Sequence, residues 1–271
     1  MFFLPVETQA KKQVYTLPVN HGDAHIITND TGDIAVLDTG STTAVDTVTR
    51  AIECFSPDRI ETLMITHSHP DHIGNADTLL KQFGAQRIIV PPTESGQAYR
   101  EIWQYAGKHS TKYRPVVRGD TVELLPGVTG YILHPSRNFK GGKNESSLAM
   151  GFKLNEVKFL FMGDVVGKGE EELMKQYKPS PVDVLKLAHH GDRKGARPRF
   201  LRKIRPRIGI IPAPVRPKDP WGYPDRELLD RLHQYNVPYI QTGIHGLINI
   251  ETTPDSYNIR HRKEWNCDNF H

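Results

Sequence analysis

Three imidazoles and one carboxylate lie within six residues of this 271-residue chain, in the stretch His67-Ser68-His69-Pro70-Asp71-His72. Imidazole and carboxylate groups are good ligands for divalent ions such as zinc, manganese or iron. Side chains alternate along an extended loop, so His67 and His69 are expected to point to one side. Asp71 and His72 follow a proline-stiffened turn and can face a second point. The spacing therefore predicts ligands for two neighbouring metal ions, with zinc the favoured metal.

The neighbouring residues predict where this stretch lies in a fold. The run Thr62-Leu63-Met64-Ile65-Thr66 before it is apolar and predicts a buried strand. Asn75 behind it is a typical capping residue for a helix over Ala76–Phe83, and Gly84 is a typical stop. A loop between strand and helix is where an open α/β sheet carries its functional site.

Further candidate ligands follow two later strands. Asp164 comes after a strongly apolar strand and Gly163, and a carboxylate there could bridge two metal ions about 3.5–4 Å apart. His189 and His190 end another strand, so one of them can complete the second metal site while the other faces the substrate. We expect His189 to be the ligand and His190 to be a proton donor or phosphate contact, but the order stays open. Asp71 and His190 are the expected catalytic residues.

The third ligand of the first metal ion is not obvious from the sequence. Asn144 precedes a strand and could coordinate weakly or bond a substrate, and His134 is an alternative ten residues earlier. Asp38 follows an apolar run and is expected to hold the second ring nitrogen of a ligand histidine. His245 is expected to contact the substrate, near its leaving oxygen.

The composition is that of a globular protein, with 37% hydrophobic and 24% charged residues and a formal net charge of only +4. An apolar run of about 20 residues is absent, so we expect no membrane-spanning helix and no membrane partner. Cys54 and Cys267 are too few for a disulfide framework. We therefore expect a cytoplasmic protein in which Cys54 lies in a helix and Cys267 in a loose tail.

Strand and helix patterns alternate along both halves of the chain, without a linker or an internal repeat of fixed period. This order predicts an α/β fold with a two-sheet core and helices outside, in a single domain. The core is expected over about residues 14–251, followed by a loose C-terminal tail over 252–271.

The motif His-x-His-x-Asp-His resembles the signature of the metallo-β-lactamase superfamily. Five other stretches, taken together, are similar to the metallo-hydrolase domain of the competence DNA-uptake proteins (the ComEC family) and, less specifically, to phosphorylcholine esterases. These stretches are Val19–Ala24, Asn144–Leu148, Leu185–Gly191, Trp221–Pro224 and Thr242–Ile248. The resemblance implies an αββα sandwich, a site for one or two metal ions, and a metal-dependent phosphodiesterase or nuclease.

The chain departs from the pattern of that family at four positions. His21 stands where the family has Gln, and Asp192 stands for the Ser after His-His-Gly. Tyr223 replaces the His before Pro224, and His245 is a histidine that the family usually lacks. These departures affect what the resemblance implies about the substrate more than what it implies about the fold.

The basic stretch Arg193–Arg207 begins directly after Gly191 and Asp192, which follow His190. It is either a solvated helix face or a surface for the phosphate backbone of a nucleic acid. The leading hypothesis is hydrolysis of a phosphoester by a hydroxide shared between two metal ions. The alternatives are a carbon-ester hydrolase (lactonase, thioesterase or β-lactamase) and a non-catalytic metal-containing module that binds nucleic acid or a partner.

Overall fold

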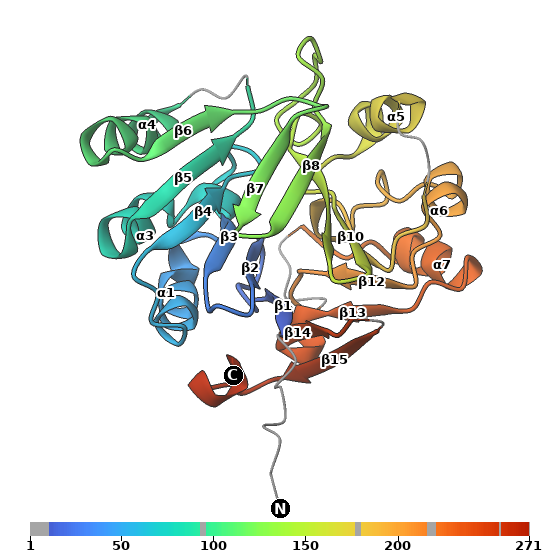
Figure 1. Ribbon diagram of the computed structural model, residues 1–271. Coiled ribbons are helices and arrows are strands. Elements are labelled where there is room, and N and C mark those ends of the chain that lie inside the picture. The colour runs from blue at the N-terminus through green and yellow to red at the C-terminus, as the bar shows by residue number, and fades with distance from the viewer. Residues whose placement is uncertain (1–10, 93–95, 177–179, 216–220, 255, 271) are drawn as a thin grey trace, which may run out of the picture.

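Two β-sheets pack face to face, and helices cover the outer face of each (Figure 1). The computed structural model describes residues 11–92, 96–176, 180–215, 221–254 and 256–270. The strand order is β15-β14-β1-β2-β3-β4-β5-β6 in the first sheet and β13-β12-β11-β10-β9-β8-β7 in the second. The expected αββα sandwich is therefore confirmed.

The elements have the following bounds. The first sheet contains β1 (Lys12–Thr16), β2 (Ala24–Thr28), β3 (Ile34–Thr39), β4 (Ile60–Met64), β5 (Ala85–Val90), β6 (Lys112–Pro115), β14 (Leu247–Thr252) and β15 (Tyr257–Arg262). The second contains β7 (Thr121–Leu125), β8 (Val128–His134), β9 (Ala149–Leu154), β10 (Val157–Phe161), β11 (Val184–Lys186), β12 (Ile208–Ile211) and β13 (Tyr239–Gln241). The helices are α1 (Val45–Glu53), α2 (Pro70–Ile73), α3 (Ala76–Phe83), α4 (Gln97–His109), α5 (Gly167–Gln176), α6 (Pro198–Ile204), α7 (Arg226–Gln234) and α8 (Thr242–His245), with 3-10 turns at Thr42–Ala44, His189–Gly191 and Cys267–Phe270.

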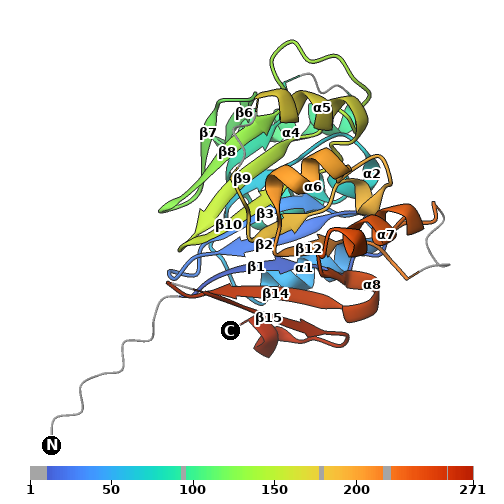
Figure 2. The ribbon, with the colours of Figure 1, turned by 90° about the vertical axis from the view of Figure 1, so that its right-hand side faces the viewer.

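The core consists of three apolar layers, because successive side chains of each strand face opposite sides of the sheet. Val14 and Ile27 lie between the two sheets, whereas their neighbours Tyr15 and Ile26 pack under the helices of the first sheet. A third layer, which includes Phe200, lies between the second sheet and its helices. The two helical layers hold both sheets in place from outside (Figure 2).

The parallel part of each sheet ends at the same edge of the sandwich. Strands β3 and β4 are parallel, and so are β10, β11 and β12. The loop after β4 is joined to the second sheet, because the backbone N–H of Leu148, directly before β9, donates to the carbonyl oxygen of Thr66 at 2.9 Å. The C-terminal ends of parallel strands from both sheets therefore converge, as the site requires.

The C-terminal residues do not form the expected loose tail. Strand β15 pairs with β14 along its whole length, and Phe270 is buried against Tyr15 with ring centroids 4.9 Å apart. Cys54, directly after α1, forms a disulfide with Cys267. A disulfide is typical of oxidising compartments, the opposite of the environment that the cysteine count predicts. The sequence gives no local signal for this contact because 213 residues separate the two cysteines.

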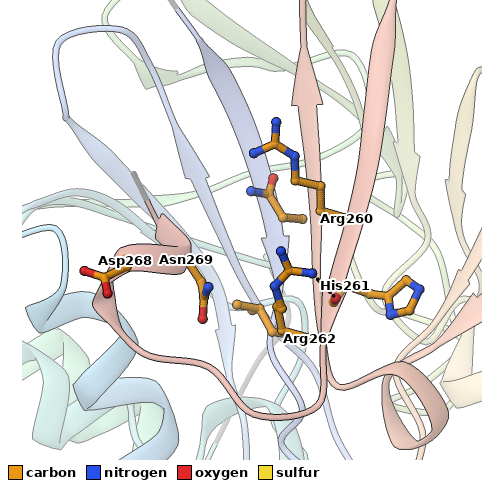
Figure 3. A pocket seen from close by; sticks show the side chains of 7 residues that line it. Arg260, His261, Arg262, Asp268 and Asn269 are labelled. Carbon is orange, nitrogen blue, oxygen red and sulfur yellow. Dashed lines mark hydrogen bonds between the residues drawn. The ribbon is translucent and has the colours of Figure 1, made fainter.

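A pocket lies between strand β15 and the C-terminal segment. Arg260 and Arg262 extend from β15 to the side on which Asn269 lies, whereas His261 points away (Figure 3). Arg260 also lies 3.6 Å from Glu251 of β14, so the neighbouring strand balances part of this charge. Within the described parts of the chain, no helix combines the length and the apolar character needed to cross a bilayer.

Candidate metal centre

The predicted ligand loop follows β4 and enters α2. His67 is fully buried, and its Nε2 lies 3.0 Å from Nδ1 of His69 and 3.5 Å from Oδ2 of Asp164. Pro70 takes the first position of α2, so Asp71 and His72 belong to a helical turn. His72 nevertheless approaches the same oxygen of Asp164 as His67, and the two rings lie 4.2 Å apart between centroids.

Asp164 lies at the centre of the candidate site. Its Oδ2 is 3.2 Å from Nε2 of His72 and 3.9 Å from Nε2 of His190, besides its contact with His67. The preceding Gly163 has a φ of +47°, and a Cβ there would lie 2.3 Å from Oγ of Ser147. Glycine is therefore required for the turn that brings this carboxylate between the histidines.

Asp38 is in the position that suits its expected supporting role. Its Oδ2 lies 2.8 Å from Nδ1 of His72, and its Oδ1 accepts the backbone N–H of Thr66 at 2.7 Å. The carboxylate is fully enclosed, with 1% of its surface exposed. It therefore fixes both the ring of His72 and the start of the ligand loop.

The geometry reverses the order expected for the adjacent histidines. Nε2 of the fully buried His190 lies 3.2 Å from Oδ2 of Asp71, within the ligand cluster. His189 is partly exposed, and its Nδ1 lies 2.9 Å from Oδ2 of Asp192. The hydroxyl of Tyr223 also donates to Oδ2 of Asp192, at 3.1 Å. His190 is therefore the better placed ligand, and His189 faces the opening of the site.

The two alternatives for a third ligand of the first metal ion differ clearly. His134 lies 2.7 Å from the carbonyl oxygen of Glu145 through Nε2 and 2.8 Å from Glu172 through Nδ1, so both ring nitrogens are engaged away from the ligand cluster. Asn144 donates to Nε2 of His189 at 3.0 Å, and its Oδ1 is buried without a hydrogen-bond partner. Asn144 is the alternative that the structure places at the site.

His245 does not join the cluster. Its Nδ1 donates to the carbonyl oxygen of Gln241 at 2.9 Å, and its ring packs on His261 at 4.9 Å between centroids. The expected substrate contact is therefore not supported. A histidine that ends a short helix carries no sequence signal for the direction of its ring.

Three residues near the site were not assigned a role from the sequence. His21 and Asp23 lie on the loop between β1 and β2, and Lys186 ends β11. Lys186 is fully buried, pairs with Asp23, and donates to the carbonyl oxygen of Gly163 at 2.9 Å. A buried lysine in a strand needs a charged partner. The single lysine in the apolar run around Lys186 therefore could have indicated a buried acidic residue nearby.

Opposite charges shift the pKa values of the cluster strongly in the metal-free protein. Burial alone would raise the pKa of the Asp164 carboxyl, but His72, His190 and His67 outweigh it and hold the pKa well below its usual range. Burial opposes the charged form of His190, yet Asp164 and Asp23 raise its pKa to about 9. The buried carboxylates therefore favour positive charge at this point.

The residues present fit divalent metal ions. Nε2 of His72 and Oδ1 of Asp164 are buried without a hydrogen-bond partner, as is the side-chain oxygen of Asn144. Among the described residues, three groups each have one potential ligand atom per residue within 4.8 Å of the others: Asp23, His72, Asp164 and His190; His67, His69 and Asp164; and His21, Asp71 and His190. Ligand atoms on a tetrahedral zinc ion with bonds near 2.05 Å are about 3.3 Å apart, which is close to the separations around Asp164.

Much of the basic stretch Arg193–Arg207 is paired within the protein. Arg197 contacts Glu170 at 2.9 Å and Glu171 at 2.7 Å, and Arg207 contacts Asp183 at 3.3 Å. Arg193 and Lys194, by contrast, are exposed and directly follow Asp192, which contacts His189. Only part of this stretch is therefore available beside the candidate centre.

Comparison with known proteins identifies the family. The family model of the Metallo-beta-lactamase superfamily matches residues 17–214. ComE operon protein 3 of Bacillus subtilis is 27% identical over 191 residues, 70% of this chain and 24% of that protein. The chain thus spans about a quarter of the length of this relative.

Solved structures show the same fold. The metallo-beta-lactamase fold protein YhfI from Bacillus subtilis has a TM-score of 0.63 at 12% identity, covering 90% of this chain and 100% of YhfI. Zinc-bound PqqB from Methylobacterium extorquens has a TM-score of 0.55 at 11% identity, covering 82% of this chain and 85% of PqqB. By its family match, its αββα sandwich and its histidine–aspartate cluster, the chain belongs to the metallo-beta-lactamase superfamily of metal-dependent hydrolases.

Proposed function

We propose that this protein is a metal-dependent phosphodiesterase or nuclease. The observation that carries the proposal is a buried aspartate–histidine cluster followed closely in the chain by two exposed cations, because Arg193 and Lys194 come directly after Asp192, the partner of His189. Similarity to ComE operon protein 3 and, at 24% identity, to Recombination protein 2 of Haemophilus influenzae supports a role connected with nucleic acid.

Two divalent ions, with zinc favoured, would be held by two overlapping ligand sets. His67, His69 and Asp164 would bind one ion. His72, Asp164 and His190 would bind the other together with Asp71, because the carboxylate of Asp23 is paired with Lys186. When bound, such ions lower the pKa of water and offset charge on the phosphoryl oxygens. Asp38 keeps Nδ1 of His72 engaged and so leaves Nε2 for the metal.

His189 and Asp192 have the geometry of a proton-transferring pair. Nδ1–H of His189 donates to Asp192, and its Nε2 lies 3.9 Å from Oδ2 of Asp164, beside the proposed ions. Asp192 would fix the tautomer and stabilise the ring when Nε2 takes up a proton. His189 can then pass that proton to the leaving oxygen of the phosphodiester.

A nucleic acid would approach across the exposed cations of the basic stretch. Arg193 and Lys194 are exposed directly after Asp192, and Arg199 and Arg205 are exposed on α6 and at its end. Replacing these four residues by Gln should flatten the salt dependence of DNA binding, because each phosphate contact releases counterions. Cleavage of a small aryl phosphodiester should stay nearly unchanged. Equal effects on both substrates would contradict a nucleic-acid partner.

The decisive experiment compares substrate classes. Purified protein loaded with zinc or manganese is assayed on bis-p-nitrophenyl phosphate, plasmid DNA, a thioester and a lactone. The proposal requires cleavage of a phosphodiester that is lost in Asp164→Asn and retained in His245→Gln, whose ring lies outside the cluster. Turnover of only the thioester or lactone would instead assign a carbon-ester hydrolase, and no turnover with any metal would favour a binding module.

A further inference from the structure

The loop between β1 and β2 is pressed against the loop that carries Asp71. Gly22 has a φ of +127°, and a Cβ there would lie 2.3 Å from the backbone oxygen of Asp71. The backbone N–H of Asp23 donates to that same oxygen at 3.2 Å. The side chain of His21, the residue before this contact, is therefore fixed beside the candidate metal centre.

Three ring nitrogens gather around one oxygen of Asp71. Oδ2 lies 3.4 Å from Nε2 of His21, 3.2 Å from Nε2 of His190 and 3.7 Å from Nε2 of His72. Ligand atoms of His21, Asp71 and His190 also lie within 4.8 Å of one another. His190 lies within hydrogen-bond distance of this oxygen, whereas Nε2 of His72 is too far away and is closer to Asp164. Ligands arranged around a shared cation account for ring nitrogens that gather without each bonding to the carboxylate.

Neighbouring rings hold His21 in this orientation. Its ring lies 4.4 Å from that of His190 between centroids and stacks on Tyr223 at 6.1 Å with an angle of 19°. The side chain is 20% exposed, so it approaches the cluster from the solvent side.

We propose that His21 is an additional ligand of the metal ion held by Asp71, His72 and His190. The inference rests on the proposed metal centre and adds a ligand to it from a separate loop. It would bring the ligand set of this ion to five residues, counting the shared Asp164. His21 would consequently raise the affinity of the protein for this ion.

Metal titration of matched variants tests this proposal. Wild type, His21→Gln and the control His245→Gln are freed of metal by chelation and titrated with zinc against a chelating dye, and with cobalt by visible absorption. We expect His21→Gln to lower the affinity for one of the two ions by about tenfold or more. Loss of a residue that only supports a ligand already lowers metal affinity by about 10–100-fold. The cobalt absorption of that ion should change as well. His245→Gln should match wild type in both titrations.

A second measurement needs no substitution. Wild-type protein is treated with diethyl pyrocarbonate with and without zinc, and modification of His21 is mapped by mass spectrometry. Zinc should protect His21, because a coordinated ring nitrogen cannot react.

Each remaining result would overturn the proposal. Unchanged zinc affinity in His21→Gln together with unprotected His21 would remove His21 from the ligand set while leaving the metal centre intact. Unchanged affinity with a raised KM alone would make His21 a substrate contact instead. Wild-type protein that binds no metal would overturn the proposed function as well, so the two failures are distinguishable.

Discussion

Oδ2 of Asp38 lies 2.8 Å from Nδ1 of His72, while Nε2 of the same ring faces Oδ2 of Asp164 at 3.2 Å. The histidine is thus placed between one carboxylate that orients it and another that shares its proposed metal ion. Because both carboxylates are 1% exposed, neither contact is weakened by solvent.

Replacing Asp38 by Asn should weaken metal binding by about 10–100-fold with little loss of folding stability. The amide can still accept the N–H of Thr66, but its NH₂ group favours the tautomer of His72 that carries the proton on Nε2. Zinc titration and thermal unfolding of the metal-free variant measure the two effects. A loss of stability without a loss of affinity would assign Asp38 to the fold alone.

Asp164→Asn should have a larger effect than Asp38→Asn, because Asp164 belongs to both proposed ligand sets. The metal content of the dialysed variant, measured by mass spectrometry, should fall below the wild-type value of about two ions. Equal metal content and activity in wild type and Asp164→Asn would show that Asp164 does not bridge the ions.

The buried His25 should make the metal-free protein sensitive to acid. Burial lowers its pKa to about 3, whereas an unfolded histidine takes up a proton near 6.5. The unfolded state therefore binds the extra proton, and stability falls as the pH drops from 6.5 towards 3, by about 1.4 kcal/mol per pH unit. Urea unfolding of His25→Gln at several pH values should show a slope smaller by about that amount. Parallel curves would contradict this assignment.

Arg197 should matter for stability more than for substrate binding. It lies 2.9 Å from Glu170, a carboxylate that is 1% exposed and whose pKa burial raises despite the arginine. Arg197→Gln should cost about 1–3 kcal/mol of unfolding free energy, because it leaves a buried charged group with a weaker partner. Glu170→Gln should restore part of this loss. The exposed Arg199 is the control, and Arg199→Gln should change stability by less than about 0.5 kcal/mol.

The disulfide between Cys54 and Cys267 should stabilise the fold. Cys54→Ser should lower the unfolding free energy by about 2–5 kcal/mol, and wild-type protein in reductant should behave like this variant. Denaturant unfolding with and without reductant measures both. Free thiols in the oxidised wild-type protein, detected by mass, would show that the bond does not form.

The sequence predicts the ligand loop and the sandwich because both depend on local patterns. Helix α3 has the expected bounds, Ala76–Phe83. Asn75, however, takes the expected position before α3 without capping it, and its amide donates to the carbonyl oxygens of Thr39 and Ser41 instead. A distant loop thus competes successfully for a side chain whose local preference was clear.

The order of His189 and His190 could not be predicted from strand alternation. Both residues have left-handed backbone conformations, with φ of +49° and +53°, so their side chains do not follow the rule for a strand. Strand β15 and the burial of Phe270 were missed for another reason, because their partners are Leu247–Thr252 and Tyr15 rather than adjacent residues. Long-range contacts of this kind leave no periodic signal in the chain.

Strand β1 lies between β2, its next neighbour in sequence, and β14, which follows more than 230 residues later. During synthesis on the ribosome, the edge of β1 therefore stays unpaired until more than 230 further residues have been translated. Tyr15 also lacks its cover until Phe270 arrives. An open strand edge and an uncovered apolar face are features that chaperones bind and that promote aggregation. A nascent chain that stalls before β14 would present both at once, because β1 gains its second neighbour in the first sheet only when β14 emerges.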